Sequence, residues 1–226
     1  MYPVLKRTLD ILLSLAALVA LSPLLVGIAL VLRFTGEGEV FFRQKRIGYQ
    51  NRPFGLLKFV TMRKDSPKSG TITVAGDPRI LPVGRTLRKS KLNELPQLVN
   101  VLLGDMSIVG PRPLTEESFA LYPKELQPLV YRCKPGLSGL GSLVFRDEEE
   151  VLRSSGKDRI TCYREDIAPL KGALEVWYHD HRSIATDLKI IASTIVAVVL
   201  PGSDFYVRWF PGMPVPERPI AAAASR

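Results

Sequence analysis

The sequence is poor in cysteine and histidine, with two of each among 226 residues. Cys133 and Cys162 are too few for a disulfide framework or a four-ligand zinc site, and they suit a reduced protein that faces the cytosol. His179 and His181 flank Asp180, but the neighbouring sequence offers no obvious further ligand for a metal. These shortages exclude a disulfide-rich scaffold and argue against a histidine metal centre.

Long apolar runs are also scarce. One uncharged run extends from Ile11 to Leu32, and the next, Ile190 to Leu200, is too short to span a bilayer. A protein with several membrane spans is therefore excluded, and a hydrophobic content of 46% excludes a disordered chain. Lysine and arginine outnumber acidic residues by 31 to 22, which gives a net charge of +9. Such a chain binds nucleic acid, a membrane surface or a phosphorylated molecule.

Nucleic acid is the least favoured of these anions, and we expect no nucleic-acid partner. The sequence has no helix-turn-helix, zinc-finger or RNA-recognition signature. Aromatic residues do not alternate with basic ones as they do in single-strand binders. The basic residues instead lie in short separate groups, which are Arg43/Lys45/Arg46, Arg85/Arg88/Lys89/Lys91, Arg112, Lys134 and Arg146.

Ser22 and Pro23 interrupt the long apolar run near its middle. Proline removes a helix hydrogen bond and kinks the helix, and Ser22 can donate back to a freed carbonyl. Basic residues flank the run on both sides, which is typical of cytoplasmic flanks. A helix that enters the membrane, bends and returns therefore competes with a plain single span. The run is too long for a cleaved signal peptide.

Four regions follow from the pattern of the chain. Residues 1–38 hold the apolar run, and residues 39–188 are expected to form a globular domain of mixed α and β elements. Residues 189–210 form an apolar helix and an aromatic segment, suited either to a membrane interface or to the core. Residues 211–226 are expected to be a disordered tail.

Within the globular domain the expected elements are short. Strands are predicted at Val40–Phe42 and Phe54–Phe59, and a loop rich in serine, glycine, lysine and proline at Asp65–Asp77. Apolar spacing predicts a helix over Leu92–Leu103 with Gly104 as its C-cap. Further helices are predicted over Leu114–Tyr131, with a break at Pro123, and over Ala185–Val199.

The most specific pattern is RTLRKSKLNELPQLVNVLLGDMSIVGPRPL at residues 85–114. Here the chain resembles the bacterial sugar transferases, the monotopic phosphoglycosyl transferases that start glycan assembly on a polyprenyl phosphate carrier. The resemblance covers nearly the whole chain. It includes KRTLDILLSL at the start, FRQKRIGYQNRPFGLLKFVTMRKD, KPGLSGLGSLVFR at residues 134–146, and DLKIIASTIVAVV near the end.

The resemblance implies an α+β fold with an N-terminal kinked re-entrant membrane helix broken at Ser22–Pro23. A small mixed α/β cytosolic domain with amphipathic interfacial helices would follow. It also implies a position on the cytoplasmic face of the bacterial inner membrane, in contact with membrane lipids. Downstream glycosyltransferases are further partners to expect.

The implied reaction has two steps. A carboxylate attacks the β-phosphate of a UDP-sugar and releases UMP, and the phosphosugar then passes to polyprenyl (undecaprenyl) phosphate. The product is a polyprenyl-diphosphate sugar, made in the first membrane step of exopolysaccharide assembly. Magnesium is the implied cofactor, and it offsets phosphate charge.

The chemistry of two motif residues suits such a reaction. Glu94, at a helix start, can offer oxygen to Mg²⁺, and the helix N-terminus adds partial positive charge that suits phosphate. Arg112 lies in the stiff turn Gly110-Pro111-Arg112-Pro113, and its planar fork can hold a phosphate through two hydrogen bonds. Each residue also has a nonfunctional interpretation. Glu94 can be only a charge at a helix start, and Arg112 can be only a surface arginine in a turn.

Three further residues are candidates for the substrate phosphates. The resemblance places Arg146, like Arg112, at the nucleotide-sugar phosphates and Lys58 near the active site. Arg88 is a basic residue close to the same motif. The competing readings are a local ion pair between Arg146 and the acids at residues 147–150, and a solvated strand residue for Lys58.

Asn93 departs from the family pattern, in which the nucleophile is an aspartate immediately before the glutamate. An amide has no anionic oxygen and is a poor nucleophile. Another carboxylate can replace it, and the candidates are Asp105 and the acids from Asp147 onward. The competing interpretation of the acids from Asp147 onward is a solvated charge run at the start of a helix. Glu94 can itself be the nucleophile, or the chain is an inactive member that binds nucleotide sugar as a scaffold. The candidate catalytic residues are therefore Asn93, Glu94 and Asp147.

Overall fold

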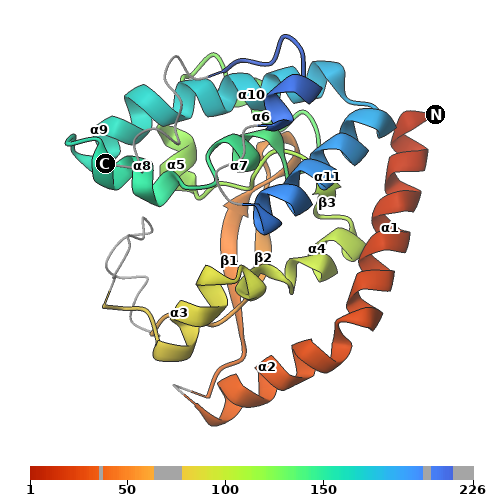
Figure 1. Cartoon of the computed structure of the whole chain (residues 1–226), viewed down its shortest axis with the longest axis vertical. Helices are drawn as coiled ribbons and strands as arrows, with labels where there is room; N and C mark the ends of the chain where they lie inside the picture. Colours follow the sequence, from red (N-terminus) through yellow and green to blue (C-terminus); the bar gives the residue numbers. More distant parts are fainter. Residues whose placement is uncertain (36–37, 64–77, 201–204, 216–226) are drawn as a thin grey trace.

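The computed structural model describes residues 1–35, 38–63, 78–200 and 205–215, and it mixes helices and strands as expected for an α+β protein. The predicted loop Asp65–Asp77 lies outside these residues. Two small sheets lie among the helices (Figure 1). The strands are β1 (Phe41–Ile47), β2 (Pro53–Phe59), β3 (Ser107–Val109) and β4 (Gly136–Ser138). The helical elements are α1 (Tyr2–Ala20), α2 (Ser22–Phe34), η1 (Tyr49–Asn51), α3 (Pro82–Lys89), η3 (Leu92–Glu94), α4 (Gln97–Leu103), α5 (Glu116–Ala120), α6 (Gln127–Val130), α7 (Leu140–Val144), α8 (Glu148–Ser154), α9 (Arg159–Cys162), η4 (Tyr163–Ile167), α10 (Ala168–His181), α11 (Ile184–Val199) and η5 (Phe205–Trp209).

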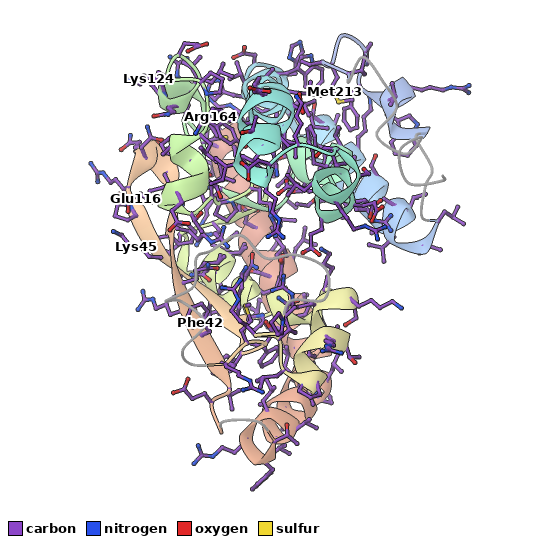
Figure 2. The ribbon with its side chains drawn as sticks, turned by 90° about the vertical axis from the view of Figure 1, so that its left-hand side faces the viewer. Phe42, Lys45, Glu116, Lys124, Arg164 and Met213 are labelled. Carbon is purple, nitrogen blue, oxygen red and sulfur yellow. The ribbon has the colours of Figure 1, made fainter. Side chains whose placement is uncertain are left out.

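The β1–β2 hairpin confirms both predicted strands, and each is longer than expected. The strands are antiparallel, with Phe42 opposite Lys58, and residues in the left-handed backbone region turn the chain between them. Phe42 and Lys45 of β1 are both exposed (Figure 2). Lys45 there pairs with Glu116 of α5 at 3.5 Å, and because both side chains are largely exposed this contact adds little stability.

The apolar run folds as two helices rather than one. Helix α1 ends at Ala20, α2 begins at Ser22, and the two are bent by 62°, which confirms the break at Ser22–Pro23. The Ser22 hydroxyl donates to the Val19 carbonyl at 2.8 Å, so it satisfies backbone at the break. No single helix among the described residues is long and apolar enough to cross a membrane, whereas this bent pair passes by length and composition.

Helix α1 runs along one side of the molecule and α2 turns from its lower end beneath the hairpin and α3 (Figure 1). The buried Asp10 carboxylate fastens α1 to β3, since its Oδ1 accepts from the Ser107 hydroxyl at 3.0 Å and from the Ile108 amide at 2.9 Å. Arg7 donates to the carbonyls of Val101 (2.6 Å) and Leu102 (2.8 Å), the last turn of α4. A cation there also meets the negative end of the helix dipole.

A second anchor joins the start of α1 to α10 and α11. The Asp187 carboxylate accepts from Lys6 at 2.9 Å, from the Tyr2 hydroxyl at 3.0 Å and from the Tyr178 hydroxyl at 2.7 Å. Asp187 and Tyr178 are buried. The first ten residues are therefore part of the globular structure, and α2 packs on it again through the buried Ile28 and Leu32.

The main core lies among α7, α10 and α11, with Tyr131 and Tyr178 as its largest buried side chains. Helix α11 confirms the helix predicted from Ala185, and its Ile190 is fully buried. The following segment packs on the same core through Phe210 and Met213, both buried. Residues 216–226 of the predicted tail lie outside the described residues.

The single helix predicted over Leu92–Leu103 is wrong in its first half. The chain forms the 3₁₀ turn η3 and then α4, because Pro96 has no N–H to bond the carbonyl four residues before it, and the amides of Leu98 and Val99 instead bond three residues back. Gly104 caps α4 in the left-handed region, at φ 96°, as expected. The break predicted at Pro123 is confirmed, since two short helices, α5 and α6, lie on either side of it.

We expect Asp10→Ala to lower the free energy of unfolding by about 2 kcal/mol, because the buried donors of Ser107 and Ile108 lose their acceptor. Denaturant unfolding followed by tryptophan fluorescence measures this. Thr8→Ala, at an exposed position of the same helix, should change stability by less than about 0.5 kcal/mol. Equal effects of the two substitutions would show that the Asp10 bonds do not hold α1 in place.

Candidate active site

Four charged side chains from separate elements interact at one place. Arg46 comes from β1, Lys58 from β2, Glu94 from η3 and Arg112 from the turn after β3. Arg112 Nη2 donates to Glu94 Oε1 at 3.0 Å, with the two side chains 35% and 16% exposed. Lys58 and Arg46 each interact electrostatically with both Glu94 and Arg112. Predicted residues Lys58, Glu94 and Arg112 are thus brought together.

Glu94 is held beside β2 by the segment that follows it. The buried amide of Asn100 in α4 accepts from the Leu57 backbone N–H and donates to the Gly55 carbonyl, both at 2.9 Å. Asp105 accepts from the same amide at 3.2 Å, so this acid supports α4. Leu57 immediately precedes Lys58, and α4 follows η3. The Asn100 bonds to β2 therefore place η3 close to Lys58.

The Arg112 turn is fixed by close backbone contact with the strand β4. The amide of Gly110 donates to the Ser138 carbonyl at 2.9 Å, and the amide of Gly136 donates to the Pro111 carbonyl at 2.8 Å. A Cβ on Gly110 would lie 2.3 Å from the Lys134 carbonyl oxygen, and a Cβ on Gly136 would lie 2.1 Å from the Gly110 nitrogen. The two glycines are therefore required for this approach.

Side chains complete the support of the turn. The Tyr131 hydroxyl donates to the Arg112 carbonyl and accepts from the Leu114 amide, both at 2.8 Å. Arg46 donates to the Pro113 carbonyl at 3.1 Å. Arg112 therefore extends from a backbone that is hydrogen-bonded on both sides, which preorganises its guanidinium.

The charges in this cluster are unbalanced toward positive. Burial lowers the pKa of Lys58 to about 7, against the attraction of Glu94. Burial also lowers the pKa of Arg46 to about 10, with Arg112 adding to the effect. Burial alone would raise the pKa of Glu94, but Arg112 and Lys58 outweigh it and hold that pKa well below its usual range. One carboxylate faces three cations, so the cluster suits a phosphate.

A second buried acid lies behind the Arg112 turn. Glu175 of α10 is 2% exposed, and its Oε1 would be 2.3 Å from a Cβ on Gly141. Neither carboxylate oxygen accepts a hydrogen bond of normal geometry from the described residues, although the Arg112 and Gly141 amides lie close enough to lower its pKa slightly. Burial prevails and raises the pKa of Glu175 to about 7, despite nearby Lys171.

The remaining predicted residues lie around this centre. Arg88 of α3 pairs with Glu149 of α8 at 3.5 Å, and it interacts electrostatically with Lys58. Arg146 donates instead to the Ala197 carbonyl of α11. Asp147 is exposed at the start of α8.

Asn93, next to Glu94, is only 5% exposed. Its side-chain oxygen has no hydrogen-bond partner among the described residues. A buried amide oxygen beside a carboxylate fits a Mg²⁺ ion that takes its other ligands from substrate phosphates. The described residues contain no group of three or more His, Cys, Asp or Glu side chains that could hold a metal by themselves.

Sequence reasoning missed several residues of the site. Arg46 had been placed only in a basic group, Glu148 only in the acidic segment 147–150, and Lys171 and Glu175 had not been singled out. Lys171 and Glu175 are four residues apart on α10, a spacing that puts both on one helix face. The structure shows that this face is buried. The spacing of the two residues was the only signal in the sequence.

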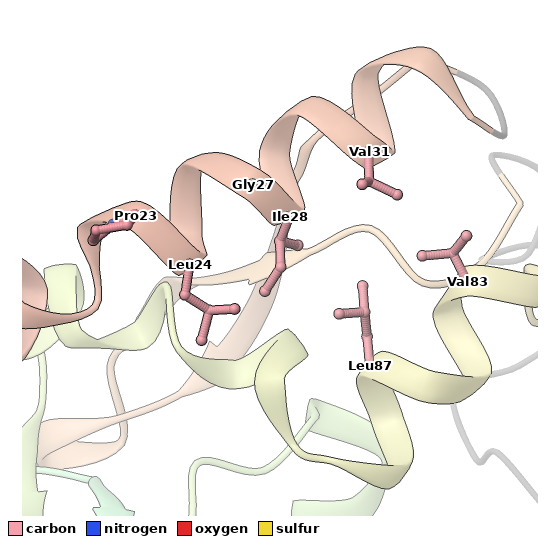
Figure 3. A pocket seen from close by; sticks show the side chains of 7 residues that line it. All are labelled: Pro23, Leu24, Gly27, Ile28, Val31, Val83 and Leu87. Carbon is pink, nitrogen blue, oxygen red and sulfur yellow. The ribbon is translucent and has the colours of Figure 1, made fainter.

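An apolar groove lies where the bent helix pair packs on the globular domain. It has a volume of about 360 Å³ and lies between α2 and α3 (Figure 3). Leu87 of α3 belongs to the same small core as Phe59 and the partly buried Leu92. These three residues are the sequence neighbours of Arg88, Lys58 and Asn93. Its lining residues are Pro23, Leu24, Gly27, Ile28, Val31, Val83 and Leu87.

Comparison with known families identifies the chain. The sequence model of the family described as Bacterial sugar transferase matches residues 1–201. The chain belongs to the bacterial sugar transferases. This confirms the predicted family and, with it, the prediction of a sugar transferase enzyme.

Curated relatives cover most of the chain. The exopolysaccharide production protein PSS of Rhizobium leguminosarum bv. phaseoli is 37% identical over 209 residues, 89% of this chain and 98% of that protein. The exopolysaccharide production protein ExoY of Sinorhizobium fredii is 34% identical over 216 residues, 88% of each chain. The UDP-glucose:undecaprenyl-phosphate glucose-1-phosphate transferase of Caulobacter vibrioides is 35% identical over 198 residues, 86% of this chain and 69% of that protein.

We expect Glu175 to make stability fall with rising pH. Its folded-state pKa of about 7 is above the ordinary value of 4.5, so its contribution is complete below pH 4.5 and is lost as the pH rises through 7. Glu175→Gln should remove this loss, worth at most about 3 kcal/mol between pH 4 and pH 8. Urea unfolding of both proteins across that pH range measures it. Parallel pH profiles would contradict the protonation of Glu175 in the folded protein.

Proposed function

We propose that this sugar transferase moves a sugar 1-phosphate from a UDP-sugar to undecaprenyl phosphate, with release of UMP. The observation that carries the proposal is the partly buried cluster of Arg46, Lys58 and Arg112 around a single carboxylate, Glu94. A relative of similar sequence carries the name of a UDP-glucose:undecaprenyl-phosphate glucose-1-phosphate transferase. Two others are exopolysaccharide production proteins, which suits a role at the start of exopolysaccharide assembly.

In this proposal the cluster holds the diphosphate of the donor. Arg112 binds a phosphate through its fork, and Lys58 adds a positive charge that becomes more stable when the anion arrives. Arg88, whose Glu149 partner is largely exposed, is free to exchange that partner for a phosphate oxygen. Glu94 keeps Arg112 in position until the donor binds.

Magnesium is the proposed cofactor, and Glu94 with the amide oxygen of Asn93 would hold it. Asn93 Oδ1 is buried without a partner among the described residues, and Glu94 is ionised beside it. When bound, Mg²⁺ would offset the charge of the phosphates. Replacing the family's aspartate by Asn93 reduces the negative charge available to the ion by one.

We further propose that the bent pair α1–α2 is re-entrant at the cytoplasmic face of the inner membrane. Large apolar side chains, including Leu12, Val19, Val26 and Leu30, are exposed on both helices, and such a surface is unfavourable in water. The groove between α2 and α3 then receives the first isoprenoid units of the acceptor, while its phosphate lies at the charged centre. Membrane lipids cover the remaining apolar surface.

A test of the function is UMP release by the full chain in detergent with undecaprenyl phosphate and a panel of UDP-sugars. Turnover supports the transferase. Nucleotide-sugar binding without UMP release from any donor would support the alternative function, a scaffold made inactive by Asn93.

We expect Arg112→Lys to lower kcat/KM at least about tenfold, because a point charge cannot replace the two-pronged contact with phosphate. The UMP assay measures this. Arg159→Lys, the same change at an exposed arginine of α9, is the matched control and should leave kcat/KM unchanged. Equal activity of the two variants would remove Arg112 from the donor site.

The groove makes a separate prediction about the acceptor. Gly27 lines the groove, and a Cβ on it would meet nothing within 4 Å, so the side chain of Gly27→Leu should occupy groove space. We expect KM for undecaprenyl phosphate to rise several-fold with KM for the UDP-sugar unchanged. Val26→Leu, on the exposed side of α2, is the control. If both variants keep the wild-type acceptor KM, the isoprenoid chain lies elsewhere.

A further inference from the structure

The proposed transfer through a covalent phosphosugar needs a carboxylate that Asn93 cannot supply. The Asn93 side chain is an amide, and its buried oxygen carries no full negative charge. If the proposed function holds, an acid from another part of the chain has to reach the donor.

Glu94 is poorly suited to attack phosphorus. Its Oε1 accepts from Arg112 at 3.0 Å, its side chain is 16% exposed, and Lys58 and Lys91 also attract its charge. One oxygen of Glu94 is thus committed to the arginine that the proposed function places on the donor phosphate. Its contacts suit the holding of Arg112 and of a cation.

Glu148 is the acid of the 147–150 segment that turns inward. Its Oε2 accepts from Lys171 of α10, whose side chain is 3% exposed. By contrast Asp147 is exposed, Glu149 pairs with Arg88 on the rim, and Glu150 pairs with Arg153 within its own helix. Glu148 itself is 29% exposed, so a substrate can reach it.

Lys171 holds Glu148 in a defined position. The Lys171 ammonium lies 5.7 Å from the ring centroid of Phe145 and 6.0 Å from that of Tyr163, and both contacts restrict its side chain. Because Lys171 bonds Oε2, the other oxygen of Glu148 remains available.

Glu148 is also close enough to Arg112 to interact with it electrostatically, as Glu94 does. Its negative charge stabilises the Arg112 guanidinium, and Lys171 lies close enough to Arg112 to oppose this. The Arg88–Glu149 pair holds the start of α8 against α3. A phosphate bound by Arg112 and Arg88 would therefore lie next to Glu148.

We propose that Glu148 is the nucleophile that carries the phosphosugar in this chain. One Glu148 oxygen forms a bond to the β-phosphorus of the UDP-sugar, the bond from that phosphorus to the bridging oxygen breaks, and UMP leaves with the electron pair. An oxygen of undecaprenyl phosphate then bonds to the same phosphorus. The bond to Glu148 breaks, which regenerates the carboxylate and yields the undecaprenyl-diphosphate sugar.

The test uses the full chain with each UDP-sugar and no acceptor. Intact-mass spectrometry detects the phosphosugar adduct, and hydroxylamine cleavage followed by peptide mapping marks its residue, since an acyl phosphate leaves a hydroxamate. We expect the mark on Glu148. A mark on Glu94, Asp147 or any other residue would overturn the proposal. Because this experiment uses the wild-type chain, it does not depend on the folding of a variant.

Variants give the second arm. Glu148→Gln should lower UMP release at least about 100-fold while UDP-sugar binding by calorimetry stays within a few-fold of wild type. Glu150→Gln, the same change on the same helix at an acid paired with Arg153, should keep wild-type turnover. Turnover by Glu148→Gln would refute the nucleophile and leave the proposed function standing, whereas no UMP and no adduct from the wild type with any donor would refute both.

Discussion

The close approach of β3 and β4 is the constraint on which the rest of the site depends. Gly110 and Gly136 bring two backbones within hydrogen-bond distance, where any Cβ would collide with backbone atoms. Arg112 extends from the end of this contact, and Glu175 lies behind it. Asp10 fastens α1 to β3 itself. A three-residue strand thus sets the relative positions of the N-terminal helix, Arg112 and a buried acid.

The charge at the centre is incomplete in the protein alone. Three cations face Glu94 at a site where burial already costs Lys58 much of its proton affinity. Taking cations out of water without enough negative charge is unfavourable, and a bound diphosphate relieves the imbalance. The basic side chains are thus already in place for a polyanion. In the proposed function, Glu94 pairs with Arg112 until the donor binds. The free-energy cost of burying these basic side chains is met when the protein folds, so it does not reduce the affinity for such a substrate.

The bent pair packs on the globular domain at residues that are next in sequence to members of the charged centre. Leu87 and Phe59 belong to the apolar cluster against α2, while their neighbours Arg88 and Lys58 belong to the charged centre. Two adjacent residues of one element therefore serve an apolar and an ionic surface. Such a junction suits the proposed acceptor, which has an isoprenoid chain and a phosphate head. The anchors of α1 at Asp10 and Asp187 hold the two surfaces at a constant relative position.

Local chemistry alone determined much of this protein. The break at Ser22–Pro23, the two hairpin strands, the Gly104 cap and the motif around Glu94 and Arg112 all follow from nearby residues, because proline, glycine and side-chain alternation act within a few positions. The split of the helix at Pro96 was missed, although its cause is equally local.

Only the tertiary structure decided which charged groups face one another. Arg146 reaches the Ala197 carbonyl, and Glu148, rather than Asp147, turns inward because Lys171 meets it from a helix 23 positions along the chain. Arg46 joins the centre because β1 pairs with β2 and the chain after Arg112 returns to β1. Such pairings depend on burial and on distances across the core, which act between residues far apart in sequence.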